Sequence, residues 1–160
     1  MITGLNHSSF TVADTNRAVR FWSILGFEGP GIVERNSEWV GKVTGVPNAK
    51  IRVAHLHGYG HHLEFIEYAG GNRDNPAALP DQPGVGHICL DVQNIHETFK
   101  ELLSAGASAL GEMTDIEEPG IATCTAGYLR DPNGIIIELL ERRTTQSSPV
   151  NNPIFTHRAV

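Results

Sequence analysis

Residues 4–22 read GLNHSSFTVADTNRAVRFW, and residues 84–102 read GVGHICLDVQNIHETFKEL. The two stretches share a Gly, a His and a Val at matching places, with His7 corresponding to His87, at an offset of 80 positions in a chain of 160 residues. A repeat at this spacing is typical of a duplicated structural module. Each copy begins with the alternation of a half-buried strand and continues with apolar residues at helical spacing.

Capping residues mark the ends of the two expected helices. Asp14 or Thr15 can cap the first helix, and Asn94 can cap the second, because short polar side chains accept hydrogen bonds from the first free backbone amides. Gly26 and Gly106 stand where the helices should end, since glycine adopts the left-handed conformation that closes a helix.

Three strand-like runs follow each helix, so the order β-α-β-β-β is written twice. The runs cover about residues 27–35, 50–57 and 61–68 in the first half, and about 108–113, 122–130 and 135–141 in the second. We therefore predict an α+β fold in one domain over residues 1–141, with module one at about 2–69, a linker at 70–83, module two at about 84–141, and a C-terminal tail at 142–160.

The composition narrows the function classes. Lys plus Arg number 12 against 18 for Asp plus Glu, a net charge of −6 that argues against nucleic acid or an anionic membrane as partner. Neither a signal peptide nor a membrane span is recognisable, so we expect a cytoplasmic protein with a small-molecule substrate. Eight histidines against two cysteines indicate that any metal would be held by imidazole and carboxylate.

A second repeated element ends each half: residues 63–67 read LEFIE, and residues 137–141 read IELLE. Side chains alternate along a strand, so Glu64 and Glu138 should face the same side as His7 and His87 on the first strands. Two imidazoles and two carboxylates can hold one divalent metal and leave positions for water or substrate. The ion could be Ni, Co, Zn, Mn or Fe.

The doubled module, the two His-Glu pairs and the Asp131-Pro132-Asn133-Gly134 turn resemble the vicinal oxygen chelate superfamily, which includes glyoxalase I, methylmalonyl-CoA epimerase, extradiol dioxygenases and bleomycin- and fosfomycin-resistance proteins. The resemblance covers about residues 2–141. It implies two βαβββ modules that form an open, cup-like mixed sheet around a metal, commonly in a homodimer. Whether each site is built within one chain or across two stays open.

The ligand pattern favours some members of this superfamily over others. Glu64 stands where ring-cleaving dioxygenases carry His, and drug-sequestering members usually lack the ligands that this chain has. Bacterial glyoxalase I has the same His-Glu-His-Glu set. Its glutathione-binding pattern is not matched, because Thr11 and Tyr68 stand where such glyoxalases carry Arg and Asn.

The resemblance implies a lyase or isomerase that transfers a proton next to a carbonyl through a metal-chelated enediolate. Glu138 is the expected base, with Glu64 as a ligand that can share the role. A non-haem iron ring-cleavage dioxygenase and an antibiotic-binding resistance protein are the alternatives.

Two further residues are candidates for the substrate pocket. If Gly58-Tyr59-Gly60 forms a symmetric three-residue hairpin, Arg52 lies on the metal face and can hold an acidic substrate group; a surface pair with Glu67 is the alternative. His62, two residues before Glu64, shares its face. The long connection around Trp39 is expected to act as a lid or a dimer arm.

Overall fold

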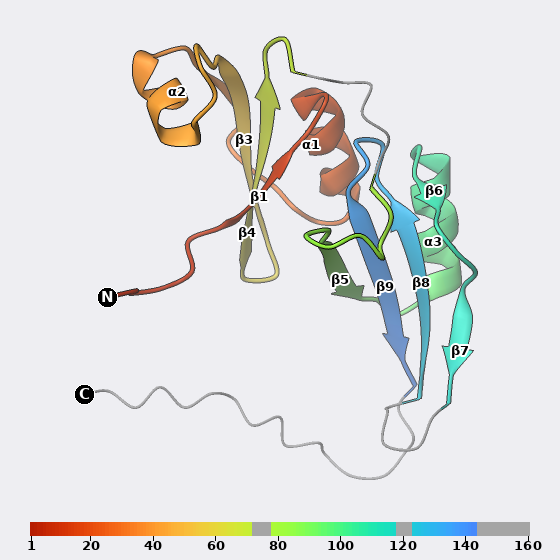
Figure 1. Cartoon of the computed structure of the whole chain (residues 1–160). Helices are drawn as coiled ribbons and strands as arrows, with labels where there is room; N and C mark the ends of the chain where they lie inside the picture. The colour runs from red at the N-terminus through yellow and green to blue at the C-terminus, as the bar shows by residue number, and fades with distance from the viewer. Residues whose placement is uncertain (72–77, 118–122, 144–160) are drawn as a thin grey trace.

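Two mixed sheets, one from each half of the chain, form the architecture (Figure 1). The structure is a computed structural model that describes residues 1–71, 78–117 and 123–143. The first sheet has the order β1-β4-β3-β2, with strands Ser8–Thr11, His61–Tyr68, Ile51–Gly58 and Ile32–Arg35. The second has the order β5-β9-β8-β6, with strands His87–Asp91, Ile136–Arg142, Cys124–Arg130 and Ser108–Ala109, and β7 (Thr114–Ile116) also pairs with β8. The predicted α+β fold of two repeated modules is confirmed.

The same pairing scheme occurs in both modules. The first strand lies parallel to the last, in the register Ser9 opposite Glu64 in module one and Cys89 opposite Glu138 in module two. The remaining pairs are antiparallel. Each module therefore places its Glu beside the strand that carries its His, in module two, or begins directly after it, in module one.

The helices α1 (Thr15–Ile24) and α3 (Ile95–Ser104) begin at the expected caps. The side chain of Asp14 accepts from the amide of Arg17 at 3.0 Å, and the side chain of Asn94 accepts a matching bond at the start of α3. The second Glu of each repeated element adds another cap. Glu67 accepts from the Thr15 amide, and Glu141 accepts from the first amide of α3, both at 3.0 Å. These glutamates therefore stabilise the fold on the face opposite Glu64 and Glu138.

A single buried cluster joins both modules. It contains α1, α3 and the helix-facing residues of both sheets, including Phe21, Trp22, Phe65, Phe99 and Leu139. Across this core the indole Nε1 of Trp22 donates to the buried carboxylate of Asp131, at 3.1 Å. Burial raises the pKa of Asp131, although three backbone amides and the Trp22 indole oppose the shift. The sheet faces that carry Glu64 and Glu138 point away from this cluster.

Several elements differ from those expected. Residues around Trp39 form a short helix, α2 (Glu38–Thr44), where a loop was predicted. Val40 of this helix is fully buried and packs with Ile66 of β4, so α2 covers one end of the face that bears Glu64. The run predicted at 108–113 is replaced by two separate short strands, β6 and β7.

Parts of the expected organisation lie outside the described residues, namely residues 72–77 of the linker at 70–83, the start of the run at 122–130, and the tail beyond residue 143. Strand β9 includes Arg142, which was assigned to the tail. Within the described part of the chain, no helix is long and apolar enough to cross a membrane. The cytoplasmic location stays a prediction.

Candidate metal centre in two halves

The first half-site consists of His7, just before β1, and Glu64, in the middle of β4. Their Nε2 and Oε2 atoms are 3.4 Å apart. Ser9 of β1 donates its hydroxyl to the same Glu64 oxygen at 2.7 Å. The Glu64 side chain is only 15% exposed, because neighbouring strands flank it on both sides.

The second half-site repeats this pair in module two. His87 Nε2 lies 3.1 Å from Glu138 Oε2, and the hydroxyl of Tyr128 on β8 donates to that oxygen at 3.1 Å. Burial and the Glu138 carboxylate raise the pKa of Tyr128, so the phenol keeps its proton. Cys89 lies beside Glu138 on β5, and burial together with that carboxylate raises the pKa of its thiol to about 11.

The donor set of each half-site fits a divalent cation. His7 Nδ1 lies 2.6 Å from Asn6 Oδ1, an acceptor, so Nδ1 donates to Asn6 and Nε2 is the ring nitrogen that faces Glu64. Nitrogen and oxygen ligands about 2.1 Å from one ion lie about 3.0 to 3.4 Å apart, which matches the separation in both half-sites.

The two half-sites do not meet within one chain. No group of three or more His, Cys, Asp or Glu side chains able to hold a metal occurs in residues 1–71, 78–117 and 123–143, and all four predicted ligands belong to these ranges. In the described part of one chain the four predicted ligands therefore form two separate His–Glu pairs rather than one cluster of four.

The internal repeat extends to residues that the sequence patterns did not single out. His55 lies directly opposite Glu64 in the β3–β4 pair, and Tyr128 lies directly opposite Glu138 in the β8–β9 pair. Ser9 was also missed. His55 and Tyr128 occupy equivalent positions in the two modules but differ chemically, so no sequence motif identifies them. Their equivalence is visible only in the strand register.

Four histidine rings gather around the first half-site. His62 lies on the Glu64 face as predicted, with its Nε2 3.0 Å from His55 Nδ1 and its ring stacked on His57. His7 approaches the same ring with a centroid separation of 5.3 Å. Burial, followed by the neighbouring imidazoles, lowers the pKa of His62.

Arg52 does not lie on the metal face, and the hairpin register predicted for it is wrong. The β3–β4 loop contains two residues, Tyr59 and Gly60, both with positive φ, so Arg52 pairs with Glu67; the three-residue loop expected from sequence would have paired it with Ile66. Its guanidinium lies 3.0 Å from the Glu67 carboxylate on the helix side of the sheet. One residue of register moves a side chain to the other face.

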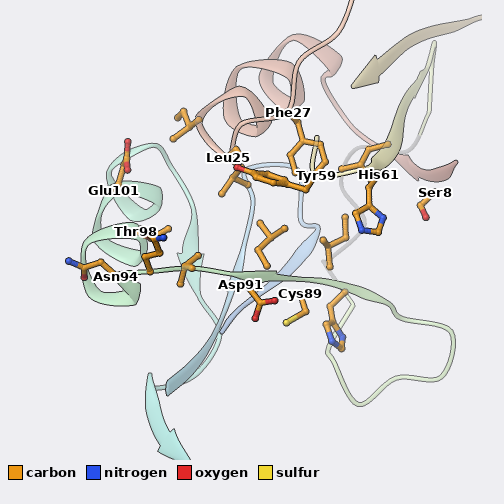
Figure 2. Close-up of a pocket in the computed structure, with 17 residues that line it drawn as sticks. Ser8, Leu25, Phe27, Tyr59, His61, Cys89, Asp91, Asn94, Thr98 and Glu101 are labelled. Carbon is orange, nitrogen blue, oxygen red and sulfur yellow. Dashed lines mark hydrogen bonds between the residues drawn. The ribbon is translucent and has the colours of Figure 1, made fainter. Parts of the chain in front are cut away.

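A cavity of about 910 Å³ lies beside the second half-site. Every residue of β5 lines it, from His87 to Asp91. Phe27 and Tyr59 of module one border it on the opposite side from Cys89 and Asp91 (Figure 2). Among the described residues, β5 pairs only with β9, so its outer edge lies open along this cavity.

Comparison with known proteins agrees with this architecture. The sequence model of the Glyoxalase/Bleomycin resistance protein/Dioxygenase superfamily matches residues 4–139. An ethylmalonyl-CoA/methylmalonyl-CoA epimerase from Cereibacter sphaeroides is 31% identical over 145 residues, which are 87% of this chain and 98% of the epimerase.

Solved structures share the fold. A glyoxalase family protein from Bacillus cereus superposes with a TM-score of 0.79 at 24% identity, covering 90% of this chain and 97% of that protein. A fosfomycin resistance protein from Mesorhizobium loti superposes with a TM-score of 0.53 at 17% identity, over 87% and 91% of the two chains. At these identities the likeness concerns the fold.

Proposed function

The chain belongs to the glyoxalase/bleomycin resistance/dioxygenase superfamily, and from this premise we propose that it is a metal-dependent isomerase or lyase that transfers a proton next to a carbonyl group. The observation that carries the proposal is the imidazole–carboxylate pair in each module, with nitrogen–oxygen separations of 3.4 and 3.1 Å. His7, Glu64, His87 and Glu138 would hold one divalent cation per complete site. When bound, that cation would stabilise the negative charge that develops on the substrate oxygens.

The protein residues divide the remaining work. Glu138 takes the role of base because its carboxylate is held in place at the site yet remains partly exposed to an incoming substrate. Glu64 shares the acid–base role on the opposite side of the substrate. A base on each side of a carbon is what inversion of its configuration requires, since the proton leaves one face and returns to the other.

Epimerisation is the first reaction to test. The Cereibacter sphaeroides relative is an epimerase by name, and the two carboxylates of the proposed site would supply the two bases that inversion requires. The likeness to the fosfomycin resistance protein is one of fold, so it does not favour an antibiotic as ligand. Ring-cleavage chemistry is less well supported because Glu64 replaces the His expected there.

We also propose that complete sites form between two copies of the chain. Each copy leaves one edge of β1 and one edge of β5 unpaired among its described residues, next to half-sites one and two respectively. In a homodimer with two-fold symmetry, half-site one of one copy can face half-site two of the other, which yields two equivalent four-ligand sites.

Mixing two inactive variants tests both proposals. His7→Ala and His87→Ala should each lose metal as homodimers, because each removes one ligand from both sites. A heterodimer of the two, isolated with two different affinity tags after co-expression, regains one intact site. It should bind one divalent ion per dimer, with about half the parental turnover per dimer.

The outcomes separate the two proposals. A metal-free heterodimer, with a parent that binds metal, would place the whole site within one chain. A parent that takes up no Co²⁺ or Zn²⁺, or that fails to exchange the substrate proton of methylmalonyl-CoA with deuterated solvent, would count against the proposed chemistry. The matched variant Arg52→Met should retain metal, since Arg52 lies on the other face.

A further inference from the structure

We propose that Tyr128 is a positioning residue whose hydroxyl holds the Glu138 carboxylate against His87 and thereby sets the cation affinity of half-site two. The inference rests on the proposed metal site. It adds a residue to that site which neither the sequence motifs nor the His-Glu repeat points to.

The geometry is a compact triangle of polar atoms. Tyr128 Oη lies 3.1 Å from Glu138 Oε2 and 3.4 Å from His87 Nε2, and the last two atoms are 3.1 Å apart. The phenol ring stands edge-on to the imidazole, with centroids 5.2 Å apart. Since Tyr128 and Glu138 are directly opposite in the β8–β9 pair, the backbone itself fixes this approach.

Half-site one obtains the same hydrogen bond from a different position. In half-site one the residue opposite the carboxylate is His55. Its Nε2 is 3.6 Å from Glu64 Oε1, too far for a hydrogen bond, and its Nδ1 is 3.0 Å from His62 Nε2. Ser9, on the other neighbouring strand, donates instead. The equivalent of Ser9 in module two is Cys89, whose thiol also donates to Glu138 but is a weaker donor than a hydroxyl.

Each module therefore places one hydroxyl on the carboxylate oxygen that faces the imidazole, although the hydroxyl comes from opposite neighbouring strands. The residues at both flanking positions differ between the two halves, yet each half has a hydroxyl that donates to its carboxylate. A carboxylate held in this way loses less rotamer freedom on binding a cation than an unrestrained Glu would.

The test removes one oxygen atom. Tyr128→Phe keeps the ring packed against His87 and deletes the hydroxyl, so the metal-free variant should fold with the thermal midpoint of the parent. Co²⁺ affinity, measured by competition with a chromophoric chelator, should fall about 10- to 100-fold, the range for groups that orient a metal ligand. The Co²⁺ absorption spectrum should change, because Glu138 adopts a different orientation.

Tyr68→Phe is the matched control, because Tyr68 lies on β4, where it packs against the cluster beneath α2. It should leave Co²⁺ affinity unchanged, while Ser9→Ala should weaken affinity through the other carboxylate.

Three results would overturn the inference. Unchanged Co²⁺ affinity and spectrum in Tyr128→Phe would show that the hydroxyl positions nothing. A phenolate charge-transfer band in the Fe³⁺-loaded parent, absent in Tyr128→Phe, would make Tyr128 a direct ligand instead. If the unmodified protein binds no Co²⁺, both this inference and the proposed function fail. If the unmodified protein and Tyr128→Phe bind Co²⁺ with equal affinity, only this inference fails.

Discussion

Replacing Trp22 with Phe tests the contact that ties the two modules together and hence fixes the half-sites relative to one another. The Trp22 side chain is completely buried, and its Nε1 donates to Asp131 Oδ2 at 3.1 Å. Phe fills much of the space without supplying a donor, so the 3%-exposed Asp131 loses one of its hydrogen bonds. A hydrogen bond to a charged group contributes about 1.5–3 kcal/mol to the free energy of unfolding.

The expected effect is large enough to measure by calorimetry. For a chain of this size each kcal/mol lowers the midpoint temperature by about 2–4 °C, so Trp22→Phe should unfold about 3–12 °C earlier than the parent. Trp39→Phe is the matched control because Trp39 is half exposed on α2. Its free energy of unfolding should change by less than about 0.5 kcal/mol.

The pH dependence gives a second, independent readout. Burial raises the pKa of Asp131 in the folded protein above its ordinary value of 3.8. At a pH between 3.8 and that raised pKa, the folded protein binds more protons than the unfolded chain. Stability contributed by this group therefore falls as pH rises through that window. The Trp22 donor lowers the pKa, so its loss extends the window upward, and the stability gap between variant and parent should widen from acid to neutral pH.

The reasoning would be refuted by a gap that is the same when Asp131 is protonated and when it is charged. It would equally be refuted if Trp22→Phe were no less stable than Trp39→Phe. Urea unfolding in a pH series from acid to neutral measures both quantities.

Three further predictions follow from the fold and the half-sites. Chelator treatment should lower the midpoint temperature, and restoring Zn²⁺ at 100 times its dissociation constant should return about 2.7 kcal/mol; an unchanged midpoint would show that the folded state holds no such ion. Glu67→Gln weakens the cap on Thr15 and should cost about 0.5–2 kcal/mol in urea unfolding without altering Co²⁺ affinity, because Glu67 lies on the helix face. Gly29→Ala would place a Cβ 1.9 Å from the His55 carbonyl oxygen and should destabilise by about 1–3 kcal/mol, whereas Gly111→Ala, with nothing within 4 Å, should be neutral in the same assay.

The two half-sites were accessible from sequence because strand periodicity is robust. His7 and Glu64 are far apart in the chain, yet the apolar residues that alternate with them, Phe10 on β1 and Leu63 and Phe65 on β4, mark the core face and place both on the other one. The internal repeat identified the second pair, because the same succession of a His and then a Glu recurs at His87 and Glu138. Neither step required knowledge of loop lengths, which is why the pairs assemble as expected within each module.

Arg52 could not be placed because its face depends on one residue of loop length. Gly58 resembles a turn glycine, but it is the last residue of β3, and a Cβ there would lie 2.9 Å from the Phe27 ring. The glycine is required for packing, and the turn contains only Tyr59 and Gly60. Sequence alone does not distinguish these two uses of glycine, and the register shifts with the choice.

Tyr128 shows a different limit of reading a repeat. A sequence repeat shows itself through identical residues, and His55 and Tyr128 differ although they occupy the same register position. What the two halves share is a hydroxyl on the carboxylate, supplied by Ser9 in one and by Tyr128 in the other. In a repeated fold the same hydrogen bond can therefore come from different neighbouring strands, and residues paired across a sheet need to be compared by the atom that they place at the site.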